Sequence, residues 1–451
     1  MSELKIPQGY KKTEIGVIPE NWACDSLESV CPKGRKYCIV DGPFGSNLKT
    51  EHYRKGGIPI ITSGFVTDGT FQVDNYLFVD EEKFRQEKRS AVNPSDIVMA
   101  KIGARCGASA ILPKEHVVGI LSGNALKITV DESKHHTYFI WQLLWDLYTK
   151  GSLDDITTTG AQPAISMSSL KKYLIPLPPI NEQTAIATAL SDVDTLISEL
   201  EKLIAKKQAI KTATMQQLLT GRTRLPQFAL REDGTPKRTK PSELGEIPED
   251  WEVVTLGDIG QTVIGLTYSP NDVADFGTLV LRSSNVQNGK LAYADNVYVN
   301  MELPERVIVK QGDILICVRN GSRQLIGKCA LIDENAEGSA FGAFMSIFRT
   351  KYSVFVFYQF QSDLIQNQIN EIMGATINQI TNKDMSGFKI TLPSDEKEQT
   401  AIATILSDMD AEIQALEQRL GKTRQIKQGM MQELLTGKTR LIKPSKEVIH
   451  E

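Results

Sequence analysis

The feature that most constrains this chain is a long segment that occurs twice. Residues 182–225 and 398–441 align without a gap, and both ends match almost letter for letter. In each copy apolar residues recur at alternating steps of four and three, which makes one narrow apolar seam typical of a coiled coil. The seam residues are Ile186, Leu190, Val193, Ile197, Leu200 and Ile204 in the first copy, and Ile402, Leu406, Met409, Ile413, Leu416 and Leu420 in the second. The repeat therefore predicts two long helices that pair with each other.

The ends of the two copies suggest why they match. Gly221 and Gly437 follow the last apolar pair of each copy and make good helix stops. The seam weakens near Lys207 and Lys211, which predicts a shift of register there. A helical hairpin in a core would also explain the pattern. However, a core helix tolerates many hydrophobic exchanges, so the near-identity favours two equivalent platforms for two equivalent partners. The candidate partner contacts are Gln183, Ile186, Leu218, Leu219, Gln399, Ile402, Leu434 and Leu435.

The duplication extends beyond the helices. The two halves of the chain begin with similar sequences, at residues 15–22 and 244–251. Each half is therefore predicted to hold a globular domain followed by a long helix. The predicted boundaries are a polar tail (1–13), a first domain (14–180), a first spacer helix (181–225), a linker (226–243), a second domain (244–396), a second spacer helix (397–441) and a tail (442–451). Proline, glycine and charge in the linker predict a flexible surface segment whose basic end, residues 237–240, is solvated.

The two domains share an order of elements but differ in their polar loops. Residues 92–100 and 309–317 are each typical of a turn that leads into a buried strand, and each is followed by a polar loop. Helices are predicted at 138–148 and 354–373. The framework is duplicated and the surface has diverged.

Composition excludes several classes of protein. No apolar run reaches the length of a membrane span, and the polar N-terminus is not a signal peptide, so we expect no membrane contact. Six cysteines in 451 residues predict a reducing cytoplasm without disulfides. Cys24, Cys31 and Cys38 lack a CxxC or paired histidines, so a metal site among them is the less favoured alternative.

No catalytic motif is found. The GKT at 421–423 and 437–439 lacks the upstream glycine of a phosphate-binding loop. A metalloprotease helix, a dinucleotide loop and a nucleophile elbow are missing as well. A nuclease or methyltransferase would need clustered carboxylates, for which Asp313 and Glu334 are the one weak candidate, and Asp313 is better explained as shaping a turn. The chain is therefore interpreted as a recogniser rather than an enzyme.

Two diverged domains on two equivalent long helices are suited to binding DNA. Each domain can recognise one half-site, and the bases between the half-sites are not recognised. Arginine suits guanine, and asparagine or glutamine suits adenine. Three loops in each domain supply the candidates, although turn chemistry is the alternative for any single residue. The candidates are Ser63, Lys101, Arg105, Thr158 and Gln162 in the first domain, and Arg282, Ser283, Asn285, Gln287, Arg319, Asn320, Ser322, Arg323, Asn378 and Gln379 in the second. Lys33, Arg35 and Lys36 are candidates for phosphate contacts.

The chain resembles the specificity subunit of type I restriction-modification enzymes over nearly its whole length. The resemblance rests on the Ile-Pro-x-x-Trp motifs at 18–22 and 247–251, the Glu-Gln pairs at 182–183 and 398–399, and the duplicated spacers. The second domain is also similar to the family at 281–289 and 339–344. Gly421 and Gly429 depart from a regular spacer and should loosen its C-terminal half.

The resemblance implies an α+β fold with two target-recognition domains, built from twisted, mainly antiparallel sheets with helices. The domains would be separated by two long helices in an antiparallel coiled coil, with pseudo-two-fold duplication. It implies that each domain reads one half of a bipartite asymmetric site in double-stranded DNA. Two modification subunits would dock on the spacers and carry S-adenosylmethionine for methylation of adenine N6. Restriction/translocase subunits would use ATP and Mg²⁺, and this chain itself would bind no cofactor. The alternatives are a coiled-coil adaptor without catalysis and a stand-alone DNA-binding protein.

Overall fold

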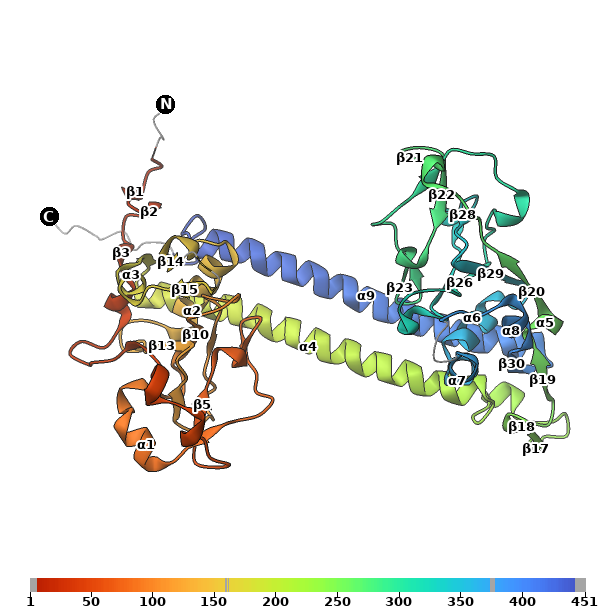
Figure 1. Ribbon diagram of the computed structural model, residues 1–451, viewed down its shortest axis with the longest axis horizontal. Coiled ribbons are helices and arrows are strands. Elements are labelled where there is room, and N and C mark those ends of the chain that lie inside the picture. Colours follow the sequence, from red (N-terminus) through yellow and green to blue (C-terminus); the bar gives the residue numbers. More distant parts are fainter. Residues whose placement is uncertain (1–5, 159, 161, 374–377, 443–451) are drawn as a thin grey trace. The chain divides into compact units, whose positions relative to one another are not determined.

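The computed structural model describes residues 6–158, 160, 162–373 and 378–442, which form two compact units. Unit 1 comprises residues 1–199 and 419–451, and unit 2 comprises residues 200–418. Two long helices, α4 (Ile180–Leu219) and α9 (Glu396–Leu434), contribute one end to each unit (Figure 1). Each unit therefore contains one globular domain together with one end of each helix.

Two four-stranded sheets form the centre of the domain in unit 1. The first is antiparallel throughout, in the order β11-β10-β13-β4, and the second has the order β8-β5-β12-β9 with one parallel pair, β5 and β12. The strands are β4 (Ile39–Asp41), β5 (Ile58–Ile61), β8 (Phe78–Val79), β9 (Ala91–Val92), β10 (Ile97–Ala100), β11 (Ser109–Ile111), β12 (Gly119–Leu121) and β13 (Ala125–Ile128). β10 and β13 are buried along their whole length, as expected for a strand between two packed layers.

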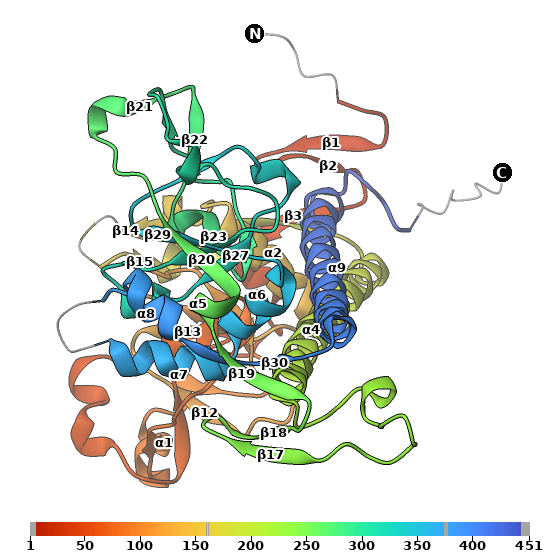
Figure 2. The same cartoon turned by 90° about the vertical axis from the view of Figure 1, so that its right-hand side faces the viewer.

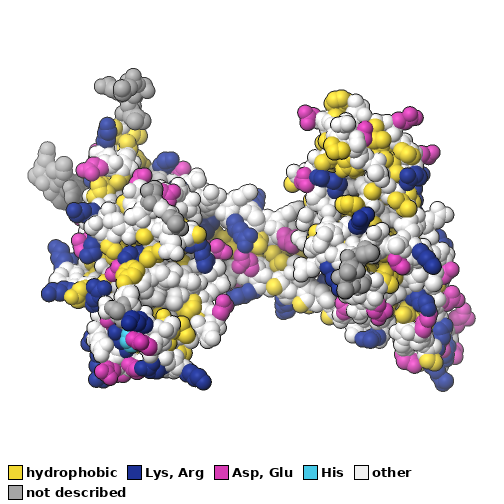
Figure 3. Space-filling model, in the orientation of Figure 1, with side chains coloured by type: hydrophobic (Ala, Val, Ile, Leu, Met, Phe, Trp, Pro, Cys, Tyr) yellow, Lys and Arg dark blue, Asp and Glu magenta, His cyan; other side chains and the backbone are white. Residues whose placement is uncertain are grey.

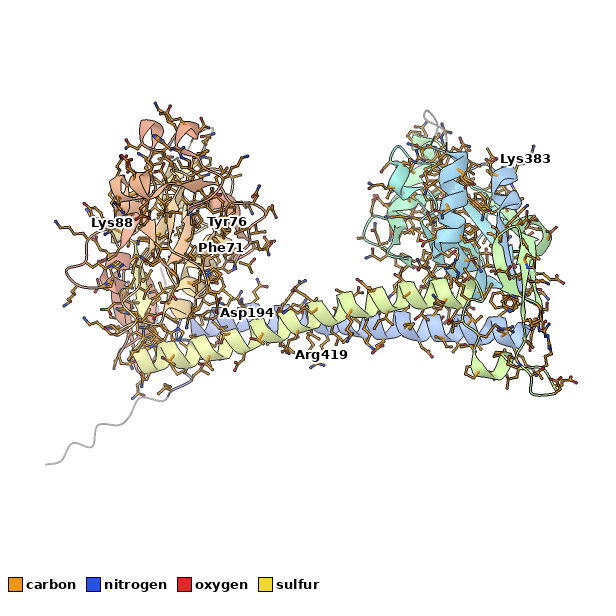
Figure 4. The ribbon with its side chains drawn as sticks, turned by 90° about the horizontal axis from the view of Figure 1, so that it is seen from below. Phe71, Tyr76, Lys88, Asp194, Lys383 and Arg419 are labelled. Carbon is orange, nitrogen blue, oxygen red and sulfur yellow. The ribbon has the colours of Figure 1, made fainter. Side chains whose placement is uncertain are left out.

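Short ribbons and helices complete unit 1. The ribbons pair β1 (Tyr10–Thr13) with β2 (Gly16–Pro19), β3 (Ala23–Ser26) with β16 (Leu174–Leu177), β6 (Val66–Thr67) with β7 (Thr70–Phe71), and β14 (Thr157–Thr158) with β15 (Ala164–Ile165). The helices are α1 (Glu81–Gln86), α2 (Thr137–Thr149) and α3 (Met167–Lys172). Phe71 and Tyr76 lie close together (Figure 4), and both rings contact Phe65 and His116. Phe65, Phe71 and Tyr76 pack against a core cluster to which both sheets contribute. Residues 10–13, which were predicted to belong to a polar tail, form β1, and the backbone of β1 pairs with that of β2.

Unit 2 repeats this architecture. One sheet is antiparallel, in the order β20-β29-β26-β27, and the other has the order β21-β25-β22-β28 with β22 and β28 parallel. The strands are β20 (Gly260–Ile264), β21 (Val273–Ala274), β22 (Thr278–Leu281), β25 (Tyr298–Val299), β26 (Ile314–Cys317), β27 (Cys329–Leu331), β28 (Ala340–Phe341) and β29 (Met345–Thr350). The predicted mainly antiparallel α+β fold is confirmed. The duplication extends to the strand order of the antiparallel sheet and to three strands of the second sheet, β8-β5-β12 and β25-β22-β28, whereas the fourth strands, β9 and β21, lie at opposite edges.

The remaining elements of unit 2 lie beside the ends of the long helices. They are β17 (Thr239–Ser242) paired with β18 (Gly245–Pro248), β19 (Trp251–Thr255) with β30 (Lys389–Pro393), β23 (Val286–Gln287) with β24 (Lys290–Leu291), and the helices α5 (Leu256–Ile259), α6 (Ser353–Gln361), α7 (Asp363–Ile372) and α8 (Asn382–Gly387). These short helices lie on the same side of the long helices (Figure 2). The helix predicted at 354–373 breaks at Ser362, whose backbone is extended and whose hydroxyl donates to the Gln359 carbonyl.

The long helices pair antiparallel within each unit. In unit 2, Lys207 of α4 contacts Glu412 of α9 at 2.7 Å, and Lys211 contacts Asp410 at 2.5 Å, so rising numbers on one helix meet falling numbers on the other. The stretch in which the apolar seam weakens is thus filled with ion pairs, and α4 continues through it without a break. In unit 1 the equivalent pair joins Lys427 to Asp194 at 2.7 Å (Asp194 is labelled in Figure 4).

Each of these aspartates also accepts a hydrogen bond from a tyrosine of its globular domain. Asp410 accepts from Tyr358 at 2.8 Å, and Asp194 accepts from Tyr138. Burial raises the pKa of both phenols, and the neighbouring carboxylate adds to the rise. Both phenols therefore stay protonated and donate to the aspartates, and these hydrogen bonds link each globular domain to the pair of long helices.

The segment predicted as a flexible linker is instead folded onto the start of the second domain. Arg231 binds the Glu249 carboxylate at 2.7 and 2.9 Å, and Lys237 binds Asp250 at 2.7 Å. Lys240 lies in β17 and donates to the Glu249 carbonyl at 2.9 Å. Of the basic residues predicted to be solvated, Lys237 is paired with a carboxylate and Lys240 with a carbonyl, whereas Arg238 is exposed.

All six cysteines are unpaired in the structure. Among the described helices, none combines the length and the apolar composition that would let it cross a membrane.

Candidate nucleic-acid interface

The three loops predicted to read DNA in the second domain meet on one surface of unit 2. Loop 1 (residues 282–288) follows β22, loop 2 (319–323) follows β26, and loop 3 (378–379) precedes α8. Asn320 of loop 2 donates from Nδ2 to the Ser283 hydroxyl at 3.2 Å, and Asn378 donates to the Gly321 carbonyl at 3.2 Å. An isolated β-bridge joins Arg319 to Gln379. Residues 374–377, which precede loop 3 in the sequence, lie outside the described residues.

These loops differ in how freely their side chains can reach a ligand. Gln287, Arg319, Ser322 and Arg323 are exposed, and Arg282, Ser283, Asn320, Asn378 and Gln379 are half-buried. Arg319 makes no ion pair with any described residue, whereas Arg282 binds Asp295 at 2.9 Å and Arg323 donates to the Asn370 carbonyl at 3.3 Å. Arg319 is therefore the guanidinium most available to an incoming base or phosphate. Basic and apolar side chains lie next to each other on the face of unit 2 shown in Figure 3.

Asn285, by contrast, is a structural residue. Its side chain is fully buried; Oδ1 accepts from the Arg282 backbone N–H at 2.9 Å, and Nδ2 donates to the Ala292 carbonyl at 2.9 Å. The prediction that Asn285 contacts DNA is not supported by this position, because both ends of the amide hold loop 1 in shape.

The predicted loops of the first domain also converge, around a residue that sequence reasoning missed. Asn124, in the turn between β12 and β13, accepts through Oδ1 from the Ser63 backbone N–H at 3.4 Å. Its carbonyl accepts from the Lys101 N–H at 2.9 Å. The Lys101 carbonyl in turn accepts from the Ile165 N–H at 3.0 Å, at the end of the third loop. Asn124 is exposed, and its position in a turn gave no signal beyond ordinary turn chemistry.

The remaining candidates of the first domain are placed unevenly. Arg105 and Gln162 are exposed, Ser63 is half-buried, and the Thr158 hydroxyl exchanges hydrogen bonds with the Ala164 backbone. Lys101 is only 13% exposed in its side chain, because it binds Asp41 at 2.5 Å and lies 4.2 Å from the centre of the Phe44 ring. Its charge is therefore neutralised within the chain, which argues against the predicted contact to DNA.

The predicted phosphate contacts lie elsewhere in unit 1. Lys33, Arg35 and Lys36 are exposed in the segment before β4. Arg35 lines a shallow groove with residues 93–96, at the N-terminal end of β10, whereas the reading loops follow the C-terminal end of that strand. The structure does not bring Arg35 together with these loops.

Each unit contains a buried cluster that joins the end of one long helix to the start of the other. In unit 2, Arg224 donates two hydrogen bonds of 2.7 Å to Glu398, and the Trp251 indole donates to the same carboxylate at 3.1 Å. In unit 1, Arg440 and Trp22 bind Glu182 in the same way, at 2.5, 2.7 and 3.0 Å. We call these contacts among an arginine, a tryptophan and a glutamate the helix-end clasps of unit 2 and unit 1.

The two clasps differ in one partner. Arg224 also binds Asp250 at 2.8 and 3.2 Å, whereas the corresponding position of unit 1 is Asn21. Partial burial alone would raise the pKa of Asp250, but hydrogen bonds from Arg224 and Lys237 outweigh burial and hold this pKa below its ordinary value. The clasps account for the Ile-Pro-x-x-Trp and Glu-Gln motifs, which sequence reasoning used only as signs of resemblance.

The eight predicted partner contacts lie inside the chain. They are all buried: Gln183, Ile186, Leu218, Leu219, Gln399, Ile402, Leu434 and Leu435. Gln183 and Gln399 each donate from Nε2 to a proline carbonyl just before their helix, at 2.8 and 2.7 Å. These side chains stabilise the chain itself, so a partner would contact their exposed neighbours.

Neighbours of these residues, among them exposed threonines, line one groove in each unit. Each groove lies between the first turns of a long helix, the first turn of a domain helix and the turn that leads into the central strand. Four residues of the long helix are the same in both grooves: Thr184, Ala187, Thr188 and Ser191 in unit 1, and Thr400, Ala403, Thr404 and Ser407 in unit 2. The first helix residue of the lining differs, Ile180 in unit 1 and Glu396 in unit 2. The opposite walls have diverged, with Lys114, His135 and His136 in unit 1 and Lys351, Tyr352 and Phe355 in unit 2.

Of the two carboxylates considered for catalysis, Glu334 is exposed and Asp313 has a structural role. Asp313 accepts from the Lys310 N–H at 2.9 Å and pairs with Arg349 at 2.8 Å, so it shapes the turn before β26. Asp96 does the same before β10, through the Asn93 N–H at 2.8 Å. Within the described ranges, no group of three or more histidine, cysteine, aspartate or glutamate residues could hold a metal ion.

Comparison with known proteins assigns the chain to a family. The family model described as "Type I restriction modification DNA specificity domain" matches residues 19–212 and, a second time, residues 248–428. The chain belongs to this family. The two matches correspond to the two halves of the duplication, and the suspected resemblance is confirmed.

Similar proteins cover nearly the whole chain. The type I restriction enzyme MjaX specificity subunit of Methanocaldococcus jannaschii is 28% identical over 96% of this chain and 97% of its own length. The MjaVIII specificity subunit of the same organism is 27% identical over 98% and 95%. Among solved structures, the S subunit of a type I restriction-modification system from M. genitalium has a TM-score of 0.56 at 16% identity, and covers 96% of this chain and 98% of that chain. The latter similarity concerns the fold alone.

Proposed function

We propose that this specificity subunit reads a split DNA site, with one half-site bound by the loops of each unit. The observation that carries the proposal is the convergence of three loops in each unit on one surface, with different side chains on matched scaffolds. Loop 2 of unit 2 presents Arg319, Ser322 and Arg323, whereas the matching loop of unit 1 presents Arg105. Divergent donors and acceptors on a common framework allow each unit to recognise a different sequence of base edges.

Recognition by this chain would serve chemistry performed by other proteins. We assign methylation of adenine N6, with S-adenosylmethionine, to two modification subunits, and ATP- and Mg²⁺-dependent translocation and cleavage to restriction subunits. The chain itself is assigned no cofactor. A second solved structure, with a TM-score of 0.52 and 15% identity to this chain, is described as concerning complex assembly of the type I restriction-modification system, which supports a multi-subunit setting.

The two grooves are the proposed docking places for the two modification subunits. They lie in different units, share the same helix residues and are open in the chain alone. A single kind of partner that binds twice needs two equal surfaces, and the matched threonine and alanine residues provide them.

The docking proposal is tested by substitution of one threonine in each groove. Thr188→Arg should abolish co-purification of one modification subunit, Thr404→Arg should abolish the other, and the double variant should retain neither. Thr195→Arg is the matched control, because Thr195 is exposed on the same helix outside the unit 1 groove. Retention of both subunits by the double variant would contradict the assignment.

The reading function is tested by mapping N6-methyladenine across the genome of cells that express this chain with its modification subunit. Residues 244–396 are then replaced by the equivalent segment of another specificity subunit. We expect a split motif in which only one half changes. Methylation that does not depend on this chain would favour the alternative of a coiled-coil adaptor.

A further inference from the structure

One turn of unit 2 places an exposed aromatic ring in the middle of the reading loops. The turn joins β28 to β29 and is closed by a hydrogen bond from the Met345 N–H to the Gly342 carbonyl at 2.9 Å. Phe344 lies at its tip with 56% of its surface exposed. A single exposed apolar residue is common on protein surfaces, so its exposure alone does not indicate function.

The position of the turn is what indicates a function for Phe344. Its carbonyl accepts hydrogen bonds from the Val318 and Arg319 N–H groups at 3.0 and 3.1 Å, which ties the tip to loop 2. The Gly342 N–H donates to the Leu281 carbonyl at 3.0 Å, which ties the base of the turn to the start of loop 1. The ring is thus anchored to both loops through the backbone.

The side chains of Arg319 and Phe344 contact each other at this turn. The guanidinium lies 5.3 Å from the centre of the ring, within the range of a cation–π contact. Because no described carboxylate pairs with Arg319, the ring is what orders it. An arginine that is ordered before binding loses less side-chain entropy when it meets a base.

Unit 1 has the same turn with different chemistry. The Ala125 N–H donates to the Ser122 carbonyl at 3.0 Å, and the Lys101 N–H donates to the Asn124 carbonyl at 2.9 Å, just as the Val318 N–H donates to the Phe344 carbonyl at 3.0 Å. Asn124 therefore occupies the place of Phe344. An amide in one unit and a phenyl ring in the other, on the same anchored turn, is the pattern expected of a position that reads different bases.

We propose that Phe344 is a base-reading residue of unit 2 that contacts the C5-methyl group of a thymine, next to a guanine bound by Arg319. In the major groove the thymine methyl is the apolar feature of the base edges, and arginine prefers guanine O6 and N7. A ring and a guanidinium in contact match these two neighbouring features. The proposal rests on the proposed function, since it names the bases that the unit 2 surface selects.

The test removes the methyl group without changing base pairing. Duplexes carry the mapped site, and each thymine of the unit 2 half-site, on either strand, is replaced singly by deoxyuridine. Binding is measured with the full chain in complex with its modification subunits. One replacement should weaken binding of the wild-type complex about fourfold, the effect of losing one buried methyl-sized group. In the Phe344→Ala complex the same replacement should have no effect.

Phe276→Ala is the control, because Phe276 is 65% exposed on unit 2 but does not belong to this turn; it should keep the wild-type response. The proposal is overturned if the half-site contains no thymine, if no replacement weakens wild-type binding, or if the Phe344→Ala complex still responds. If the half-site does not change when residues 244–396 are exchanged, the proposed function fails as well. A half-site that changes but does not respond to deoxyuridine refutes this inference alone.

Discussion

The two helix-end clasps allow the same substitution to be made in two settings that differ by one charge. Glu182→Gln and Glu398→Gln each replace a buried carboxylate that binds an arginine and a tryptophan. In unit 2, Arg224 would keep its second carboxylate, Asp250. In unit 1, no second carboxylate contacts Arg440 among the described residues. Glu182→Gln should therefore destabilise unit 1 more than Glu398→Gln destabilises unit 2.

The magnitudes follow from what each arginine loses. Removing one partner of a buried ion pair leaves an uncompensated charge and costs about 3–5 kcal/mol, which we expect for Glu182→Gln. The Arg440 side chain is 15% exposed, so water can compensate its charge only in part. For Glu398→Gln we expect about 1.5–3 kcal/mol, the range for losing a hydrogen bond to a charged group, since Arg224 remains paired. The difference between the two units should be about 2 kcal/mol.

Hydrogen exchange followed by mass spectrometry measures each unit separately. The opening free energy is compared between variants for peptides from β10 and β13 in unit 1, and from β26 and β29 in unit 2. Asn21→Asp added to Glu182→Gln should recover part of the loss, because it supplies the counterpart of Asp250. Equal losses in the two units, or a larger loss for Glu398→Gln, would refute the reasoning.

Four further substitutions at single positions have defined expected outcomes. Arg319→Ala should cost about 1–3 kcal/mol of binding to one half-site and none to the other, measured with duplexes mutated in either half. Gly221→Ala should destabilise unit 2, because φ is +69° and the new Cβ would lie 2.5 Å from the Pro248 ring. Gly421→Ala, inside α9 with open space around it, should stabilise its helix by about 0.5–1 kcal/mol. Thermal unfolding should show a lower melting temperature for the first variant and a higher one for the second. The lowered pKa of Asp250 stabilises the folded state above the ordinary aspartate pKa, and this contribution is lost as the pH falls through the lowered value; Asp250→Asn should remove that part of the acid sensitivity of unit 2 in acid titrations, and an unchanged titration would contradict it.

The sequence predicted the architecture because the repeat and the apolar seam are local patterns. The strands before the polar loops are confirmed as β10 and β26, and α2 lies within a residue or two of its predicted range. The convergence of the loops was predicted only as an ordering along the chain. The structure adds the hydrogen bonds that join them, such as Asn320 to Ser283.

Sequence reasoning failed where a polar side chain is already satisfied by a partner within the chain. Asn285 has the composition of a base-reading residue, but it holds the backbone of its own loop. Lys101 has the charge of a DNA contact, but Asp41, far away in the sequence, neutralises it. Phe344 and Asn124 were missed for the opposite reason. Their importance comes from an anchored turn, and neither residue type marks such a turn in one sequence.

The clasps also change the explanation of the near-identity at the ends of the repeat. Arg224 ends the first copy and binds Glu398, which begins the second; Arg440 ends the second copy and binds Glu182, which begins the first. Each end therefore meets the start of the other copy, and a change in one arginine removes the partner of a buried carboxylate. This requirement within the chain preserves matching ends without any partner. The exposed threonines of the grooves take no part in the clasps, so their identity remains the observation that a repeated partner explains.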